Sequence, residues 1–166
     1  MLKFVVIFLF FSPICLAKTD SFPNELFGIK IGSKPAEYEN KKIYDYVYKV
    51  VPLKKNEMLE EYSVWIDENG EIWTIKGETN SDCLNRYYSL REFLNKKYGI
   101  ESETGSENQG SLNVVFFPKK NAMMPFNILQ IFYYKENYGS NKEPCRTSVQ
   151  MVSPVNKIQK NSGKGL

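Results

Sequence analysis

Residues 67–78 read "DENGEIWTIKGE", and the Asn69-Gly70 pair within them is the strongest local constraint on the fold. Asn-Gly favours a two-residue type I′ turn, because both turn positions need a positive φ. The flanking stretches, "EYSVWID" and "EIWTIKG", are rich in Val, Ile, Trp and Tyr, which favour strands. The sequence therefore predicts an antiparallel β-hairpin centred on this turn.

A two-residue turn would place Glu68 opposite Glu71 and so fix the register of both strands. One face would carry the pairs Ile66–Trp73, Val64–Ile75 and Tyr62–Gly77, and the other Trp65–Thr74, Ser63–Lys76 and Asp67–Ile72. The first face is apolar and the second mostly polar, as a half-buried sheet requires. The same residues exclude an EF-hand calcium loop, which needs its glycine at the sixth position, whereas Gly70 is at the fourth.

Residues 79–99, "TNSDCLNRYYSLREFLNKKYG", predict the one long helix. Thr79 or Asn80 is the expected N-cap, and Gly99 suits the left-handed position beyond the C-terminus. A broad apolar stripe is expected to face the core, with Arg91 inside it; its members are Leu84, Tyr87, Tyr88, Leu90, Leu94 and Tyr98. Phe93 falls on the opposite face and is the apolar residue that this stripe does not explain.

Five further segments have strand character: residues 27–31, 43–51, 112–117, 127–134 and, more weakly, 147–152. Pro35 suits the start of one helical turn before the second of these, and residues 99–111, 118–126 and 135–146 have the composition of exposed loops. Strands and long helices do not alternate, which disfavours a parallel sheet. The predicted fold class is α+β, a mainly antiparallel sheet of about six or seven strands with one long helix packed on one face.

The N-terminus, "MLKFVVIFLFFSPICLA", is typical of a secretory signal peptide. It has a basic residue, a short apolar run and small residues at 15 and 17, where a signal peptidase would cut. Two alternatives stay open: an uncleaved membrane anchor, and a lipoprotein acylated at Cys15. The expected organisation is a signal peptide over 1–17, one domain over 18–152 and a disordered polar tail over 153–166. The mature protein is expected in the periplasm or the extracellular medium, without stable membrane insertion.

Cleavage after Ala17 leaves two cysteines, Cys83 and Cys145, and an oxidising compartment favours a disulfide bond between them. Their separation corresponds to about 4 kcal/mol of stabilisation in the chain-entropy model. The alternative is two separate thiols.

Composition excludes several function classes. Residues 18–152 hold 18 basic and 19 acidic side chains, so this part of the chain has no charge signature of nucleic-acid binding. The chain has no histidine, which removes the usual general base and the common zinc ligand. No phosphate loop or serine-hydrolase motif occurs, and we expect no cofactor and no metal. Nineteen acids still supply many carboxylate pairs of the kind that glycosidases use, but the sequence selects none.

Aromatic residues make up 14% of the chain, and they suggest the candidate binding surface. Tyr44, Tyr46 and Tyr48 alternate, so on one strand they would share a face, either packed under the helix or exposed as a ridge suited to protein contacts. Met123 and Met124 would add an adaptable apolar contact or plug a loop. We therefore expect an exported, non-catalytic protein-binding module, such as an inhibitor or immunity-type protein, with another extracytoplasmic protein as partner. The alternative is a glycan or small-molecule binder, including a carboxylate-dependent hydrolase.

Overall fold

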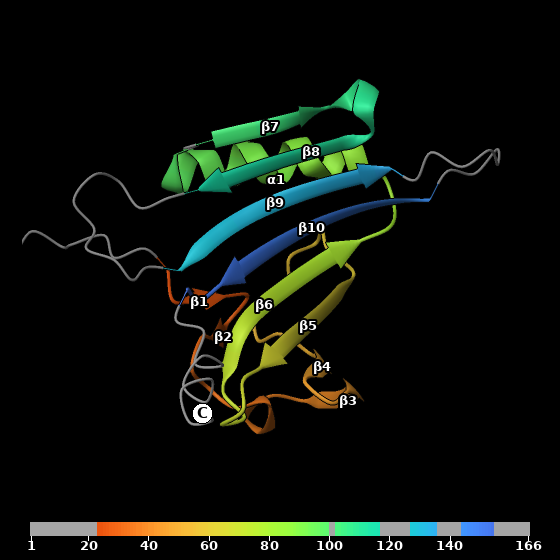
Figure 1. Cartoon of the computed structure of the whole chain (residues 1–166). Coiled ribbons are helices and arrows are strands. Elements are labelled where there is room, and N and C mark those ends of the chain that lie inside the picture. Colours follow the sequence, from red (N-terminus) through yellow and green to blue (C-terminus); the bar gives the residue numbers. More distant parts are fainter. Residues whose placement is uncertain (1–22, 100–101, 117–126, 136–143, 155–166) are drawn as a thin grey trace, which may run out of the picture.

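The computed structural model describes residues 23–99, 102–116, 127–135 and 144–154, and an eight-stranded antiparallel sheet dominates it (Figure 1). The strand order is β3-β4-β5-β6-β10-β9-β8-β7. The strands are β3 (Asn40–Tyr44), β4 (Val47–Val50), β5 (Glu61–Ile66), β6 (Ile72–Thr79), β7 (Ser102–Ser106), β8 (Ser111–Phe116), β9 (Ile128–Lys135) and β10 (Cys145–Val152). A separate two-stranded hairpin, β1 (Glu25–Leu26) and β2 (Ile29–Lys30), precedes them, and two short 3-10 helices are η1 (Pro35–Glu37) and η2 (Glu107–Gln109). The predicted antiparallel sheet with one helix is confirmed, although the strands outnumber the predicted six or seven.

Helix α1 (Cys83–Tyr98) packs on one face of the sheet, over β8, β9 and β10 (Figure 1). Tyr87, Leu90 and Leu94 of the predicted stripe are buried, and Leu84 and Tyr98 pack against the core at its margins, whereas Tyr88 is exposed. Gly99 is the C-cap and has a positive φ of 78°, but its ψ of 150° differs from the predicted left-handed conformation.

The predicted N-cap of this helix is wrong. Asp82 occupies the N-cap in a left-handed conformation, without a side-chain capping bond. Thr79 is buried at the end of β6, where its hydroxyl oxygen accepts a hydrogen bond from the N–H of Ser81 at 3.2 Å. The side chain that should cap the helix is therefore engaged in the connection that leads into it.

The N-terminal hairpin covers the β5–β6 part of the same face. The Phe27 ring meets Tyr62 edge-on, with 5.0 Å between ring centroids, and it lies over Gly77 of β6. The predicted strand over 27–31 is confirmed only in part. Ile29 and Lys30 form β2, whereas Phe27 and Gly28 have φ values of 57° and 78° and form the tight turn between β1 and β2. A left-handed Phe costs of the order of 1–3 kcal/mol, and its packing on Tyr62 offsets that strain.

The predicted β5–β6 hairpin exists, but its turn differs from the predicted two-residue one. Asp67 pairs with Glu71 through an N–H···O bond of 2.9 Å, and Gly70, but not Asn69, has a positive φ. The loop therefore has three residues, the type I turn with a glycine bulge that is the next commonest hairpin. The Asp67 carboxylate stabilises it by accepting the backbone N–H groups of Asn69 and Glu71, each at 2.9 Å.

A bulge in β6 compensates for the extra loop residue. Ile66 pairs with Ile72 instead of Trp73, and the register shifts by one between Trp65 and Ile66. The pairs beyond the bulge are those predicted: Trp65–Thr74, Val64–Ile75, Ser63–Lys76 and Tyr62–Gly77. The error is therefore confined to the residues nearest the loop.

Two other predictions of secondary structure need correction. The predicted strand over 43–51 is a hairpin, in which β3 ends at Tyr44, Asp45 and Tyr46 turn, and β4 begins at Val47. Within the predicted loop 99–111, Ser102–Ser106 form β7 by pairing with β8. The strands predicted over 112–117, 127–134 and 147–152 are confirmed as β8, β9 and β10, and the helical turn at Pro35 is confirmed as η1.

The Cys83–Cys145 disulfide is confirmed, with a Cα–Cα distance of 6.0 Å. It joins the first turn of α1 to the start of β10, where the Thr147 hydroxyl also donates to the Cys83 carbonyl at 2.6 Å. A disulfide is compatible with the predicted extracytoplasmic location. The described residues contain no helix with the length and apolar character needed to cross a membrane. The predicted signal peptide and nearly all of the predicted tail lie outside the described residues.

Candidate functional site

The β3–β4 hairpin at one edge of the sheet carries the most exposed tyrosine side chains of the described residues. Tyr44 is 72% exposed and Tyr46 is 59% exposed, and the neighbouring Ile43 is also exposed. We call Ile43, Tyr44 and Tyr46 the hairpin patch. Large apolar side chains gathered on the surface mark binding sites more often than singly scattered ones do.

The candidate residues predicted from sequence are only partly brought together. Tyr44 and Tyr46 lie next to each other at the turn, whereas Tyr48 is half-buried on β4 and packs against the core. The three tyrosines therefore do not form a ridge on one strand, because a turn separates the first from the third. Met123 and Met124 lie outside the described residues.

Strand β3 is the outermost strand on this side, and all five of its residues are exposed. The Val51 N–H donates to the Glu39 carbonyl at 2.8 Å, so the backbone groups of Glu39 face β4. Backbone groups alternate in direction along an antiparallel strand, and those of Asn40 and Lys42 therefore point outward. Among the described strands, none pairs with this outer side, so it can accept an additional strand.

A shallow hollow of about 170 Å³ adjoins the hairpin patch on the sheet face opposite the helix. Ile43, Tyr44, Val47 and Trp65 contribute its apolar lining. The predicted alternation placed Trp65 on the polar face of the hairpin, and the observed Trp65–Thr74 pair agrees. The sequence does not predict that Tyr44 lines this hollow, because the position of Tyr44 depends on the turn at Asp45 and Tyr46.

Opposite charges alternate across the floor of this hollow. Lys49 contacts Glu61 at 3.0 Å, and Lys76 contacts Glu78 at 2.5 Å. Glu61 and Glu78 are direct cross-strand partners, and Arg146 lies 3.7 Å from Glu78 on its other side. Each acid therefore has a basic neighbour, which offsets the repulsion between two adjacent carboxylates.

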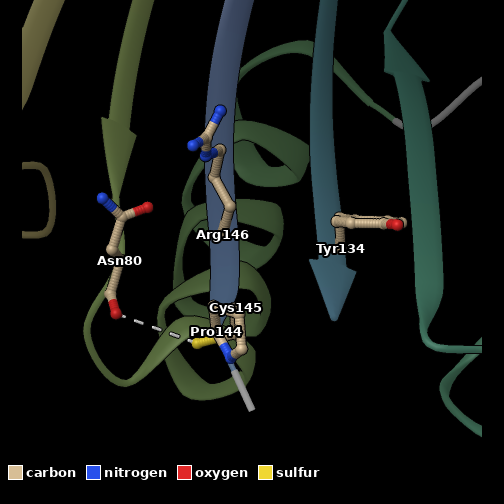
Figure 2. A pocket seen from close by; sticks show the side chains of 5 residues that line it. All are labelled: Asn80, Tyr134, Pro144, Cys145 and Arg146. Carbon is tan, nitrogen blue, oxygen red and sulfur yellow. Dashed lines mark hydrogen bonds between the residues drawn. The ribbon is translucent and has the colours of Figure 1, made fainter. Parts of the chain in front are cut away.

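A larger hollow of about 420 Å³ lies at the disulfide end of the sheet, lined by Asn80, Tyr134, Pro144, Cys145 and Arg146 (Figure 2). The Cys145 sulfur is 3.9 Å from the Asn80 carbonyl oxygen, but as a disulfide sulfur it carries no proton and is not a thiol nucleophile. Arg146 and Tyr134 are cross-strand neighbours. Residues 136–143 immediately precede this lining and lie outside the described part of the chain, so we assign no function to this hollow.

Several shifted pKa values belong to groups around helix α1. The Ser81 hydroxyl, which hydrogen-bonds the Glu60 carboxylate, lowers the pKa of that group, with further help from the Asn80 N–H. The hydrogen bond from the Tyr88 hydroxyl to Glu107 raises the pKa of Tyr88. The first contact joins the segment before α1 to the residue that precedes β5, and the second joins the outer side of α1 to η2. Both pKa shifts therefore arise from contacts that hold the helix in place.

The described residues contain no cluster of three or more acidic, histidine or cysteine side chains that could hold a metal ion. Comparison of the chain with protein-family models, with curated proteins and with solved structures found no match.

Proposed function

We propose that the chain is an exported, non-catalytic protein-binding module that docks its partner through the hairpin patch and the outer side of β3. The observation that carries the proposal is the pair of exposed tyrosines, Tyr44 and Tyr46, at the tip of an exposed edge hairpin. Tyrosine supplies a large, stiff contact surface with a polar tip, and it is enriched in protein interfaces. An inhibitor or immunity-type protein that blocks an extracytoplasmic enzyme is the role that suits such a module.

The chemistry of β3 favours one kind of partner, an extended segment with acidic side chains. A strand added to the outer side of β3 would bond the backbone groups of Asn40 and Lys42. Lys41 and Lys42 lie on this strand, and both are exposed. Acidic side chains would complement them, whereas pairing of β3 with a second copy of itself would bring lysines together.

A photo-crosslinking experiment in the native host tests this proposal. Benzoylphenylalanine replaces Tyr44 in one variant and Tyr134 in the other, because Tyr134 is a comparably exposed tyrosine far along the sheet order. We expect one protein to be crosslinked from position 44 and not from position 134. Absence of a crosslinked protein at position 44 would contradict the proposal.

The crosslinked protein is then purified and titrated with the mature chain by calorimetry. The double variant Tyr44→Ala/Tyr46→Ala should bind it about tenfold or more weakly, as expected for aromatic residues that dominate an interface. Tyr134→Ala is the matched control and should bind like the wild type. Equal affinity of the double variant and the control would mean that the hairpin patch is not the docking surface.

The hollow beside the patch supports a second candidate, a glycan-binding role. Trp65 and Tyr44 both line it, and aromatic rings with nearby polar groups are suited to stacking on a sugar ring. Glu61 and Glu78 are held in ion pairs with lysines, which supports a binding role over hydrolysis. Titration with glycan fragments should quench the Trp fluorescence in the wild type and not in Trp65→Phe, and no response in either would remove this candidate.

A further inference from the structure

A third hollow, of about 290 Å³, lies on the helix side of the sheet, between α1 and the N-terminal hairpin. We call it the helix groove. Its apolar lining includes Leu26, Phe27, Leu90, Phe93, Leu94 and Tyr98. Leu90 and Leu94 are buried, whereas Phe93 is 55% exposed. Phe93 is also the residue that the predicted core stripe leaves unexplained, and the groove accounts for its position.

The groove exists because two separate elements cover this face of the sheet. Helix α1 packs over β8, β9 and β10, and the Phe27 turn packs on β6. Val149 of β10, which pairs with Gly77 of β6, lines the groove where the two covers meet. Gly77 contributes no side chain, and the Phe27 ring occupies the space above it. The groove therefore runs between Phe27 on one side and Leu90 and Leu94 of α1 on the other.

The charged side chains around the groove are mostly basic. Lys54, Lys55 and Lys97 line it, and Glu25 is its one acid. Glu25 forms an ion pair with Lys54 at 3.0 Å, so it offsets one of the three positive charges. Lys97 lies 5.1 Å from the centroid of the Tyr98 ring, so its charge is held beside an apolar wall.

We infer that the helix groove binds an anionic amphiphile with a single acyl chain. The apolar lining would take the chain, since pockets for small ligands are mainly apolar with a few placed polar groups. The surplus of lysines would take the anionic headgroup, because complementary charge sets the orientation of the ligand. Carboxylate and phosphate headgroups share this chemistry, and the experiment below separates them. This inference is independent of the proposed docking by the hairpin patch, which lies on β3 and β4.

Calorimetry of the mature chain with dodecanoate below its micelle concentration tests the inference. We expect saturable binding of about one dodecanoate molecule per chain, and we expect dodecyl phosphate to compete for the same site. The anion that binds more tightly identifies the headgroup class. Dodecyltrimethylammonium has the same chain with a positive headgroup and should bind at least about tenfold more weakly. No saturable binding of either anion, or equal binding of the cation, would overturn the inference.

Two variants locate the site, each with a matched control. Lys97→Gln should weaken dodecanoate binding by about tenfold, whereas Lys96→Gln should leave it unchanged, because Lys96 pairs with Glu92 and does not line the groove. Phe93→Ser should weaken it similarly, and Tyr134→Ser, at an equally exposed position away from the groove, should not. Thermal melts check that all four remain folded, which their exposed side chains predict. If neither Lys97→Gln nor Phe93→Ser weakens dodecanoate binding, the ligand binds outside the helix groove and the assignment is refuted.

Other occupants of the groove are outcomes of the same experiment. If dodecanoate fails to bind and the wild type dimerises while Phe93→Ser stays monomeric in sedimentation, a second copy of the chain covers the groove and the amphiphile assignment is wrong. Failure of dodecanoate binding would leave the crosslinking result at Tyr44 untouched, so the two proposals fail independently.

Discussion

Two buried tyrosines should respond oppositely to loss of their hydroxyl groups. Tyr87 on α1 is 0% exposed, and its hydroxyl has no hydrogen-bond partner among the residues that the structure describes. Tyr62 on β5 is 5% exposed, and its hydroxyl accepts the Asn56 N–H at 2.9 Å and donates to the Asn56 carbonyl at 3.0 Å. The two sites are therefore similar in burial and opposite in hydrogen bonding.

The expected magnitudes follow from the cost of burying polar groups. A buried hydroxyl without a partner costs about 1–3 kcal/mol in proteins, so Tyr87→Phe should raise the free energy of unfolding by about 1 kcal/mol after the small loss of packing. Tyr62→Phe removes the acceptor of the Asn56 N–H, while the Asn56 carbonyl keeps its bond from the Leu59 N–H at 3.0 Å. The substitution should lower the free energy of unfolding by about 1–3 kcal/mol. Urea denaturation at pH 7, followed by Trp fluorescence, measures both. A destabilised Tyr87→Phe protein would refute the reasoning.

The pH dependence gives an independent readout of Tyr87. Burial, and after it the charge of Glu103, raises the pKa of Tyr87 from 10.0 to about 12. The folded state thus favours the neutral phenol, and the resulting stability is complete below pH 10 and is lost as the pH rises from 10 to 12. Two pH units correspond to about 2.7 kcal/mol as an upper limit. Tyr87→Phe should lose less stability than the wild type over this range, and parallel curves would contradict the buried phenol.

Three further predictions concern stability. Gly77→Ala should destabilise the fold by about 0.5–2 kcal/mol, because overpacking outweighs the strand preference for Ala. The added Cβ would lie 2.8 Å from Leu59 Cδ1. In a double-mutant cycle, a smaller cost of Gly77→Ala in the Leu59→Ala background would confirm the clash. Replacing Cys83 and Cys145 by Ala should cost about 4 kcal/mol, seen as a melting temperature about 8–16 °C lower, and a loss under 1 kcal/mol would refute it. Asp67→Ala should cost about 1–3 kcal/mol by removing the acceptor of two turn N–H groups, with Asp67→Asn costing less; equal costs would mean that the acceptor oxygen is not what matters.

Long patterns of alternating polarity predicted the strands correctly where no unexpected turn interrupted them. The strands β8, β9 and β10 followed from such patterns, and the buried stripe of α1 followed from helical spacing. The Cys83–Cys145 pair followed from the cysteine count and the predicted compartment. The two-residue turn predicted at Asn69-Gly70 is wrong because a second turn signal overlaps it. An Asp three residues before a Gly favours a type I turn, and Asp67 stands at that distance from Gly70.

Other features depend on contacts between distant segments and have no local signal. The turn at Phe27 requires a left-handed aromatic residue, which only its packing on Tyr62 and Gly77 makes tolerable. The turn at Asp45 and Tyr46 interrupts a run that alternates like one strand. The helix groove arises from how two covers meet over β6 and β10, so only the unexplained Phe93 pointed toward it.

The bulge at Trp73 explains why most of the predicted β5–β6 register is correct although the predicted turn is wrong. A three-residue loop without compensation would shift β6 by one residue against β5 and send Val64 and Ile75 to opposite faces. Both side chains are fully buried in the observed register. Such a slip would expose one of them, which would cost about 1.5–3 kcal/mol of stability for a side chain of this size. A bulge costs less, because it leaves one residue unpaired. Burial of the apolar face therefore sets the register, and the same register places Trp65 on the opposite face beside Tyr44.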